Sequence, residues 1–105
     1  MAQTPAYEIQ IAPLAFEEIR AIDVYERNRI IDEIDRQLPH QPTVQTRNRK
    51  PLLGVEAAFH HATPLWQLRV GDWRVFYDVD EGKRMVSVRA VRRKDANQRT
   101  EDILK

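Results

Sequence analysis

Hydrophobic and polar residues alternate in three segments of the second half of the chain. Residues 66–70 (WQLRV) and 73–79 (WRVFYDV) place apolar side chains at every second position, as half-buried strands do. The Gly71-Asp72 pair between them is typical of a two-residue hairpin turn. A turn at 80–83 and a third alternating segment at 85–91 follow. The pattern therefore predicts an antiparallel meander of three strands.

The first half of the chain predicts one strand followed by two helices. Tyr7–Ile11 alternates in the same way, whereas residues 14–38 carry apolar side chains at helical spacing. Asp23, three residues before Glu26, has the pattern of a capping box and starts a second helix at the next residue. The proline at position 39 ends that helix. We therefore expect a helix–helix hairpin.

Residues 39–65 show no clear period. The prolines at 39, 42 and 51 and a basic, polar run predict a long loop, although 43–47 and 55–59 each have the composition of a short strand. A loop of this length in a small domain is usually functional or contains an unrecognised element. Together with the flanking segments, the pattern predicts a single α+β domain over residues 1–105. Its N-terminal strand and helical hairpin would pack on an antiparallel sheet that ends in the meander.

The predicted hairpin turn decides which residues of the sheet face each other. A two-residue turn at 71–72 places Arg69 opposite Arg74, and a four-residue turn at 80–83 then places Arg74 opposite Arg89. Like charges facing each other destabilise a sheet, so a row of three arginines favours a bound anion. Arginine suits phosphate because its planar group donates two parallel hydrogen bonds. The alternative is that the arginines extend into water or pair with acids such as Asp78.

Charge is distributed unevenly along the 105 residues, which carry 17 Lys and Arg against 16 Asp and Glu. Residues 1–46 have a net charge of −4 and residues 47–105 a net charge of +5, which favours an anionic partner for the second half. Gln67, Phe76 and Ser87 share the predicted face with the arginine row, and Phe76 either stacks on a nucleobase or packs under the long loop. Further basic side chains are expected to gather around the row: Arg47, Arg49, Lys50, Arg92, Arg93, Lys94 and Arg99.

Several classes of site have no support in the composition. The chain has no cysteine, which excludes disulfides and thiolate chemistry and is compatible with the cytoplasm, the location that we expect. The histidines at 40, 60 and 61 lack partners at metal-ligand spacing, and the three glycines form no phosphate-binding loop, so we expect no metal and no cofactor. No apolar run is long enough to span a membrane, and residues 1–10 do not resemble a signal peptide.

The segment 68–77 (LRVGDWRVFY) resembles the RelE/ParE superfamily of toxins from bacterial type II toxin–antitoxin modules. Members typically show L-R-V-G-[DR]-[YW]-R-[VI]-x-Y at this place. Residues 50–54 (KPLLG) and 92–95 (RRKD) are similar to the superfamily's basic segments on either side, so that the resemblance covers nearly the whole chain. It implies a RelE-like fold and a toxin that a co-expressed antitoxin protein holds inactive, and we expect that antitoxin to cover part of the arginine face.

The resemblance implies different activities in the two branches of the superfamily. In the RelE branch the toxin enters the ribosomal A site and cuts mRNA through attack of the ribose 2′-OH, without a metal. It then implies catalytic roles for Arg69, Arg74 and Lys94, with Arg93 as an alternative to Lys94, and RNA binding by the other basic residues, by Phe76 and by Gln67. Gln67 stands where a further lysine is often found.

The tail tyrosine of the RelE branch is missing, with Asn97 the nearest equivalent. The ParE branch instead implies binding of DNA gyrase without catalysis, and an inactive member is a third possibility. We expect a ribosome-dependent endoribonuclease whose partners are the antitoxin, the ribosome and mRNA.

Overall fold

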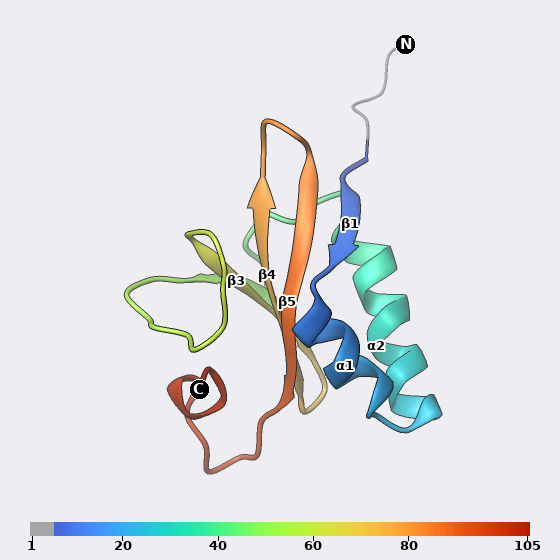
Figure 1. Ribbon diagram of the computed structural model, residues 1–105, viewed down its shortest axis with the longest axis vertical. Coiled ribbons are helices and arrows are strands. Elements are labelled where there is room, and N and C mark those ends of the chain that lie inside the picture. Colours follow the sequence, from blue (N-terminus) through green and yellow to red (C-terminus); the bar gives the residue numbers. More distant parts are fainter. Residues whose placement is uncertain (1–5) are drawn as a thin grey trace.

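A five-stranded sheet with one layer on each face forms the centre of the protein (Figure 1). The computed structural model describes residues 6–105. Met1–Pro5 lie outside the described residues, and so does that part of the expectation that residues 1–10 form no signal peptide. The strands lie in the order β1-β5-β4-β3-β2, in which β1 is parallel to β5 and the other pairs are antiparallel. The elements are β1 Glu8–Ile11, α1 Pro13–Arg20, α2 Val24–Gln37, β2 Arg49–Leu52, β3 Leu65–Val70, β4 Trp73–Asp80, β5 Met85–Arg93 and the 3-10 helix η1 Thr100–Ile103.

The helical hairpin forms where the periodicity predicts it. Pro13 is the first residue of α1, where its missing N–H leaves no hydrogen bond unmade. Asp23 caps α2, because its Oδ1 accepts from the backbone N–H of Tyr25 at 3.1 Å and of Glu26 at 3.2 Å. The return bond of a capping box is not among the hydrogen bonds of residues 6–105. The Glu26 carboxylate instead lies 3.6 Å from the guanidinium of Arg29.

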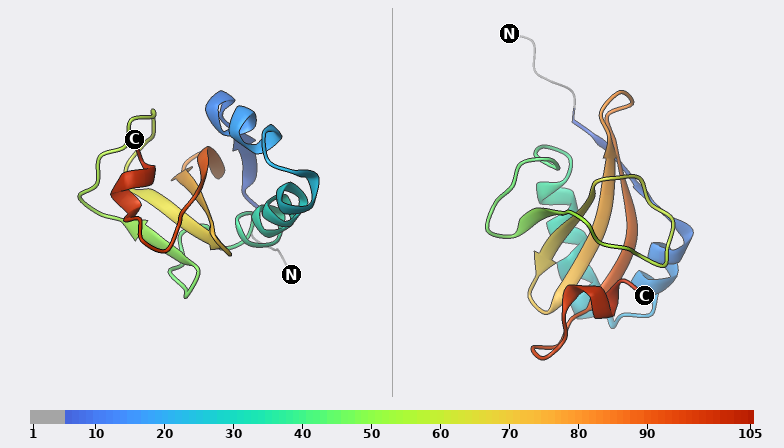
Figure 2. Two further views of the ribbon diagram at one scale, coloured as in Figure 1. Left: turned by 90° about the horizontal axis from the view of Figure 1, so that it is seen from below. Right: turned by 90° about the vertical axis from the view of Figure 1, so that its left-hand side faces the viewer.

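Both helices cover the same face of the sheet and build the larger core (Figures 1 and 2). Ile30 and Ile34 of α2 and Ile19 of α1 belong to one buried cluster with Leu68 of β3 and Val75 of β4. Alternate strand residues therefore point toward the helices, and the residues between them point to the opposite face. Within residues 6–105, no helix combines the length and the hydropathy that a membrane span requires.

The opposite face is partly covered by the loop after β2 and by η1 (Figure 2). Phe76 is buried there in a second cluster with Leu65 and Leu104, and the ring centroid of Phe59 lies 6.1 Å from its own. Of the two alternatives for Phe76, packing under the long loop is confirmed and stacking on a nucleobase is wrong, because the loop and the C-terminal segment close over its ring. Phe76 therefore stabilises the fold and cannot stack on a nucleobase.

The long loop between α2 and β3 contains a strand that the sequence pattern does not reveal. It is β2, which pairs antiparallel with β3 and places Lys50 opposite Gln67. The strand lies at neither of the two expected places, 43–47 and 55–59. A four-residue edge strand that contains a proline carries too little alternation to be recognised.

The β3–β4 hairpin has the predicted register, whereas β4 and β5 pair differently. Arg69 faces Arg74 as expected. The β4–β5 turn lies one residue later than expected, with Asp80 facing Met85, which moves every partner on β5 by two positions. A bulge between Phe76 and Tyr77 moves the partners beyond it by one more, so that Arg74 faces Arg92 and the prediction that it faces Arg89 is wrong. A bulge inserts one residue in one strand, which a strict alternation of two cannot anticipate. The predicted row of three arginines is therefore reduced to the pair Arg69–Arg74 with Arg92 beside it.

Candidate anion-binding site

A polar pocket of about 320 Å³ opens on the face of the sheet that lies opposite the helices. We call it the basic pocket. Its walls come from the segment before β2, from β2, β3 and β4, and from the chain after β5. Five of its side chains are cationic and none is acidic. The lining consists of Arg47, Asn48, Lys50, Gln67, Arg69, Arg74, Lys94 and Thr100.

Backbone hydrogen bonds bring these segments together. The N–H of Arg69 donates to the carbonyl of Asn48 at 2.7 Å, which extends the β2–β3 pairing and holds the preceding loop beside β3. The N–H of Lys94 donates to the carbonyl of Asp72 at 2.7 Å, which fixes the chain after β5 against the β3–β4 turn. The sheet therefore positions basic residues that are up to 47 residues apart in the sequence around one cavity.

Arg74 is the most deeply placed cation of the basic pocket, with 9% of its surface exposed. Its Nη1 donates to the carbonyl oxygens of Gly71 at 2.8 Å and Trp73 at 3.0 Å. In the part of the chain that the structure describes, it makes no ion pair. Burial and, second, the charge of Arg69 lower the pKa of Arg74 below its ordinary value, while Asp72 acts in the opposite direction. The lining of the basic pocket holds no acidic side chain, so a bound anion would supply the negative charge that faces Arg74.

Three neutral side chains complete the lining. Gln67 is largely buried, and its Oε1 has no hydrogen-bond partner among residues 6–105. Asn48 and Thr100 were not predicted. Both side chains are uncharged, so the charge pattern of the sequence does not indicate a role in binding. The one sequence feature that could have indicated such a role is their position next to the basic residues at 47, 49 and 99. Their polar groups can donate hydrogen bonds to a bound ligand.

Two arginines predicted at this surface are engaged elsewhere. Arg89 forms an ion pair with Asp78, in which Nε lies 2.7 Å from Oδ2 and Nη2 3.3 Å from Oδ1. Arg49 is buried on the helix face, where it donates to the backbone oxygen of Gln37 at 3.5 Å and to Oε1 of Gln41 at 3.3 Å. The expectation that these two arginines join the basic surface is wrong, because Arg89 is neutralised and Arg49 points to the other side of the sheet.

Arg92 faces Arg74 across β4 and β5 but is held by protein groups. Its Nε pairs with the carboxylate of Glu18, and its Nη1 donates to the carbonyl oxygens of Ile103 at 3.0 Å and Lys105 at 2.8 Å. Its guanidinium also lies 5.4 Å from the ring centroid of Phe59. These contacts tie α1 and the C-terminal segment to β5. Arg92 therefore has structural contacts and does not line the basic pocket, and its role in RNA binding stays a prediction.

Arg93 and Arg99 are exposed but do not line the basic pocket. Arg93 lies 3.9 Å from a carboxylate oxygen of Asp72 and 3.7 Å from one of Asp95. Arg99 precedes η1, and its backbone N–H donates to Asp102 at 2.9 Å. Of the two alternatives for the later basic residue, only Lys94 lines the pocket. Among residues 6–105 no group of three His, Cys, Asp or Glu side chains could hold a metal ion.

The chemistry available in the basic pocket is electrostatic. Its lining holds no carboxylate, imidazole or phenol. Tyr77 does not replace the missing tail tyrosine, because it lies in the core of the helix face and its hydroxyl donates to the carbonyl of Pro42 at 2.6 Å. Burial raises the pKa of the Tyr77 hydroxyl. The pocket can therefore bind a phosphate, stabilise added negative charge and donate protons from its lysines.

Several solved structures share this fold. A chain of the archaeal RelE–RelB complex from Pyrococcus horikoshii is 17% identical, with a TM-score of 0.67 over 87% of this chain and 98% of that chain. A chain of the toxin–antitoxin complex RelBE2 from Mycobacterium tuberculosis is 16% identical, with a TM-score of 0.67 over 90% and 98%. The isolated E. coli RelE toxin is 18% identical, with a TM-score of 0.67 over 89% of both chains. At these identities the likeness concerns the fold.

The sequence itself matches one family model, described as "ParE toxin of type II toxin-antitoxin system, parDE", over residues 9–97. No curated protein matches the chain. The family match extends from β1 to beyond β5 and includes all the strands and both helices. The chain therefore belongs to the ParE toxin family of the RelE/ParE superfamily and is a toxin of a type II toxin–antitoxin system.

Proposed function

We propose that this toxin inhibits translation by cutting mRNA on the ribosome, and that the basic pocket holds the scissile phosphate. The observation that carries the proposal is the opposed pair Arg69–Arg74 in a pocket with five cations and no acid. Such an arrangement is unfavourable in the free protein and favourable once a phosphate lies between the two guanidinium groups.

The reaction that fits the pocket is internal transfer of the phosphate. The ribose 2′-oxygen forms a bond to phosphorus, the bond to the 5′-oxygen breaks, and the products are a 2′,3′-cyclic phosphate and a 5′-hydroxyl. Arg69 and Arg74 stabilise the charge that develops on the non-bridging oxygens, a role worth a few kcal/mol per donor. Lys94 donates a proton to the leaving 5′-oxygen, and water accepts the proton of the 2′-OH.

We also propose that a protein antitoxin encoded beside this toxin neutralises it. Two of the structures with this fold are toxin–antitoxin complexes, RelE–RelB from Pyrococcus horikoshii and RelBE2 from Mycobacterium tuberculosis. A surface with a concentration of cations is best covered by a partner that supplies acidic side chains. The expected partner is therefore a small protein with an acidic or amphipathic segment.

A second candidate function is inhibition of DNA gyrase without catalysis, with the helical hairpin as the binding surface. Two observations favour it: the matching family model is that of ParE, and the basic pocket holds no side chain that readily accepts a proton at neutral pH. In that case the arginine pair would serve as a docking surface for the antitoxin. A third possibility is a member without activity.

In vitro translation with purified ribosomes, followed by primer extension on the message, tests these candidates. Cuts that appear only in translated mRNA support the first function. Intact mRNA together with double-strand DNA breaks in the presence of gyrase supports the second, and neither effect indicates an inactive member. Arg74→Gln and Arg93→Gln form a matched pair, because Arg74 lines the pocket and Arg93 is exposed outside it. Cleavage that is lost in both variants or in neither would contradict the assignment of the phosphate site.

A further inference from the structure

A second polar pocket, of about 290 Å³, lies beside the edge strand β2 on the helix face of the sheet. We call it the edge pocket. The C-terminal end of α2, the loop that follows it and the start of β2 form its walls. Two of its side chains are arginines, and none is acidic. The lining includes Arg36, His40, Gln41, Thr46, Asn48 and Arg49.

Arg49 brings to the edge pocket a buried charge that the protein does not balance. Only 5% of its surface is exposed, and it makes no ion pair within residues 6–105. Its two hydrogen bonds are long, at 3.5 Å to the backbone oxygen of Gln37 and 3.3 Å to Oε1 of Gln41. Its Nε is buried without a partner in the same part of the chain. Because a buried, unpaired charge is costly, this arrangement favours a bound anion.

Arg36, the second arginine of the edge pocket, is already neutralised. Its Nη2 lies 2.6 Å from Oε2 of Glu33 and 2.9 Å from Oε1 of the same carboxylate. The Arg36 side chain is also largely exposed, so water shares in its solvation. Arg49 is therefore the cation of the edge pocket that an anion would neutralise.

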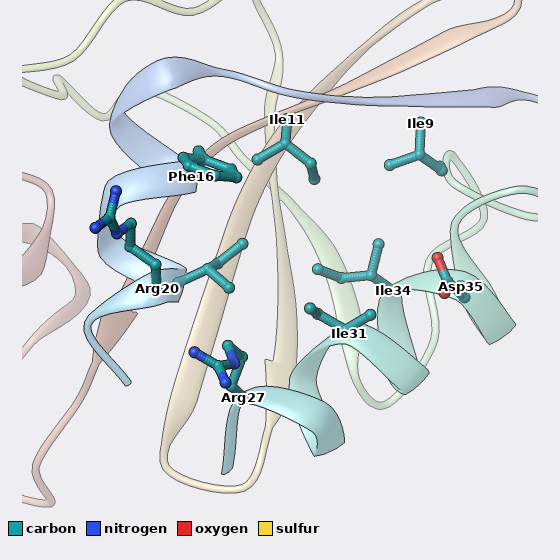
Figure 3. Close-up of a pocket in the computed structure, with 9 residues that line it drawn as sticks. Ile9, Ile11, Phe16, Arg20, Arg27, Ile31, Ile34 and Asp35 are labelled. Carbon is teal, nitrogen blue, oxygen red and sulfur yellow. The ribbon is translucent and has the colours of Figure 1, made fainter. Parts of the chain in front are cut away.

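An apolar groove on the same face, between α1, α2 and β1, carries an arginine of a different kind (Figure 3). Isoleucines dominate its lining, and Arg20 stands at its rim. The Arg20 side chain is 66% exposed and lies 3.8 Å from a carboxylate oxygen of Glu17. Water and Glu17 therefore balance the charge of Arg20 without a bound anion. Arg20 serves below as a control for Arg49.

The edge pocket and the basic pocket meet at the start of β2. Asn48 lines both pockets, whereas Arg47 before it lines the basic pocket and Arg49 after it lines the edge pocket. The hydroxyl oxygen of Thr46 fixes this turn, because it accepts from the backbone N–H of Asn48 and of Arg49, each at 3.2 Å. One ligand that passes Asn48 can therefore reach both pockets.

A smaller pocket of about 200 Å³ also joins the two, and its helix arginines are held by the protein. Arg69 and Asn48 connect it to the basic pocket, and Arg36 and Asn48 connect it to the edge pocket. Arg29 lies 3.6 Å from the carboxylate of Glu26 and packs on Gly71, where a Cβ atom would lie 2.8 Å from its Nη1.

Unbalanced positive charge is thus concentrated at the two ends of this surface, at Arg69 with Arg74 and at Arg49. A single small ion can fill only one of these two positions. A phosphodiester backbone carries separate negative charges along one chain and can fill both. The separation of the charges therefore favours a nucleic-acid strand.

We propose that the edge pocket is a second phosphate site, which binds the backbone of the strand whose scissile phosphate lies in the basic pocket. The guanidinium of Arg49 donates to the oxygens of this second phosphate. The inference rests on the proposed function in taking a nucleic acid as the ligand. It adds that the strand turns around the start of β2, and that a ligand with a single phosphate occupies only the basic pocket.

Supplying Arg49 with an internal carboxylate tests the proposal. Gln41→Glu keeps the shape of the side chain and the oxygen that accepts from Arg49, and adds the missing negative charge. The variant should fold with an unchanged far-UV spectrum and a melting temperature raised by a few degrees, because a buried cation gains a partner. Its anion site is then occupied from within.

Two 2′-deoxy oligothymidylates, which cannot be cleaved, serve as probes: a dinucleotide with a single phosphate and a decanucleotide. Binding of each to the full-length chain is measured by titration calorimetry. In Gln41→Glu we expect the affinity for the decanucleotide to fall at least ~10-fold, the scale of one charge-assisted hydrogen bond. The affinity for the dinucleotide should stay unchanged. An unchanged affinity for the decanucleotide would overturn the proposal.

Two control variants separate the edge pocket from a general effect of charge. Gln45→Glu makes the same substitution at an exposed position of the same loop that does not line the edge pocket. Arg20→Gln removes an exposed arginine of the helix face. Both should bind the decanucleotide within about threefold of the wild type. A loss in either control as large as that in Gln41→Glu would indicate diffuse attraction and overturn the proposal.

The Nε–H signal of Arg49 in a proton–nitrogen NMR spectrum reports on the occupant of the edge pocket. It should shift on addition of the decanucleotide and not on addition of the dinucleotide. A shift with inorganic phosphate but none with the decanucleotide would show a site for free phosphate and overturn the proposal. No shift with any of these probes, as expected if an acidic protein segment occupies the pocket, would overturn it too.

Failure of the proposed function has a different signature. Arg74→Gln should lose affinity for the dinucleotide, while a saturating amount of the decanucleotide still shifts the Arg49 signal. Intact mRNA in the translation assay, together with decanucleotide bound in both pockets, would refute mRNA cleavage and leave the second phosphate site in place. Cleaved mRNA together with wild-type decanucleotide affinity in Gln41→Glu would refute the second phosphate site alone.

Discussion

Arg69 and Arg74 lie directly opposite each other on β3 and β4, and neither forms an ion pair within residues 6–105. Facing like charges destabilise a sheet by some tenths of a kcal/mol. The protein holds Arg74 through the carbonyl groups of its own hairpin, at Gly71 and Trp73, and leaves its charge uncompensated. A pair arranged in this way is poorly suited to stabilise the free protein and well suited to bind a phosphate.

Replacing Arg74 should separate function from stability. In Arg74→Gln the repulsion from Arg69 disappears, while two hydrogen bonds to backbone carbonyls are lost, so we expect the free energy of unfolding to change by less than about 1 kcal/mol. Toxicity and mRNA cleavage should fall at least ~100-fold, because a donor to the transition state is removed. Thermal melts and a growth-arrest assay on the same variant measure both effects. A strongly destabilised variant with normal toxicity per folded molecule would show that Arg74 is structural.

Replacing Arg92 should have the opposite effect, although Arg92 faces Arg74 across the strands. Arg92→Gln leaves the carboxylate of Glu18 and the carbonyl oxygens of Ile103 and Lys105 without their donor. We expect destabilisation of about 1–3 kcal/mol. Specific toxicity, corrected for the folded fraction, should remain near that of the wild type. Urea unfolding beside the growth assay measures it, and a stable but inactive Arg92→Gln would place Arg92 in the functional site.

The sequence allowed the fold to be predicted where the side-chain pattern is regular. The helical hairpin, the N-terminal strand and the hairpin at Gly71-Asp72 all form as expected, because burial of one face imposes a strict period. β2 was missed, since four residues around Pro51 show no alternation. The pairing of β5 was predicted in the wrong register, because the β4–β5 turn lies at 81–84 and not at 80–83, and because the bulge beside Phe76 interrupts the period within the strand.

The candidate site was predicted in part for a related reason. The residue pair Arg69–Arg74 follows from the turn length alone, and Arg47, Lys50, Gln67 and Lys94 were named from local charge or position. The alternative that an arginine of the row pairs with Asp78 holds for Arg89. Sequence reasoning could not tell that Arg92 pairs with Glu18 of α1, because that pair depends on the tertiary structure. Binding roles remain predictions for the residues that do line the basic pocket: Arg47, Lys50, Gln67, Arg69, Arg74 and Lys94.

Salt dependence should reveal how many pocket cations contact a nucleic acid. The probe is a single-stranded 2′-deoxy oligonucleotide, which has no 2′-OH and cannot be cleaved. Each phosphate contact contributes about −0.7 to the slope of log K against log salt concentration. We therefore expect a slope from the basic pocket no steeper than about −3.5, the value for contacts by all five of its cations. Arg47→Gln should reduce the slope by about 0.7. Arg20→Gln, an exposed arginine on the helix face, serves as the control. Equal changes in both variants would indicate diffuse attraction and not a defined pocket.

Tyr77 should control the stability of the protein at high pH. Its hydroxyl donates to the buried carbonyl of Pro42, and this contact ties the start of the loop that carries Arg47 to the sheet. Tyr77→Phe leaves that carbonyl without a donor, so we expect the free energy of unfolding at pH 7 to fall by about 1–3 kcal/mol. Tyr25→Phe, at an exposed position of α2, should have no effect.

The pH dependence of this loss has a definite sign. Burial raises the pKa of Tyr77 in the folded state, and the nearby charge of Arg49 offsets this only in part. The protonated Tyr77 hydroxyl therefore contributes fully to the free energy of unfolding below about pH 10, the pKa of tyrosine in the unfolded chain. This contribution is lost as the pH rises beyond that value. The Phe variant lacks this loss, and Tyr7, whose pKa is raised by its hydrogen bond to Glu81, is the same in both proteins. Urea unfolding between about pH 7 and 11 should show the two stability curves converging above about pH 10. Parallel curves over that range would mean that Tyr77 titrates equally in the folded and unfolded states, in conflict with its burial against Pro42.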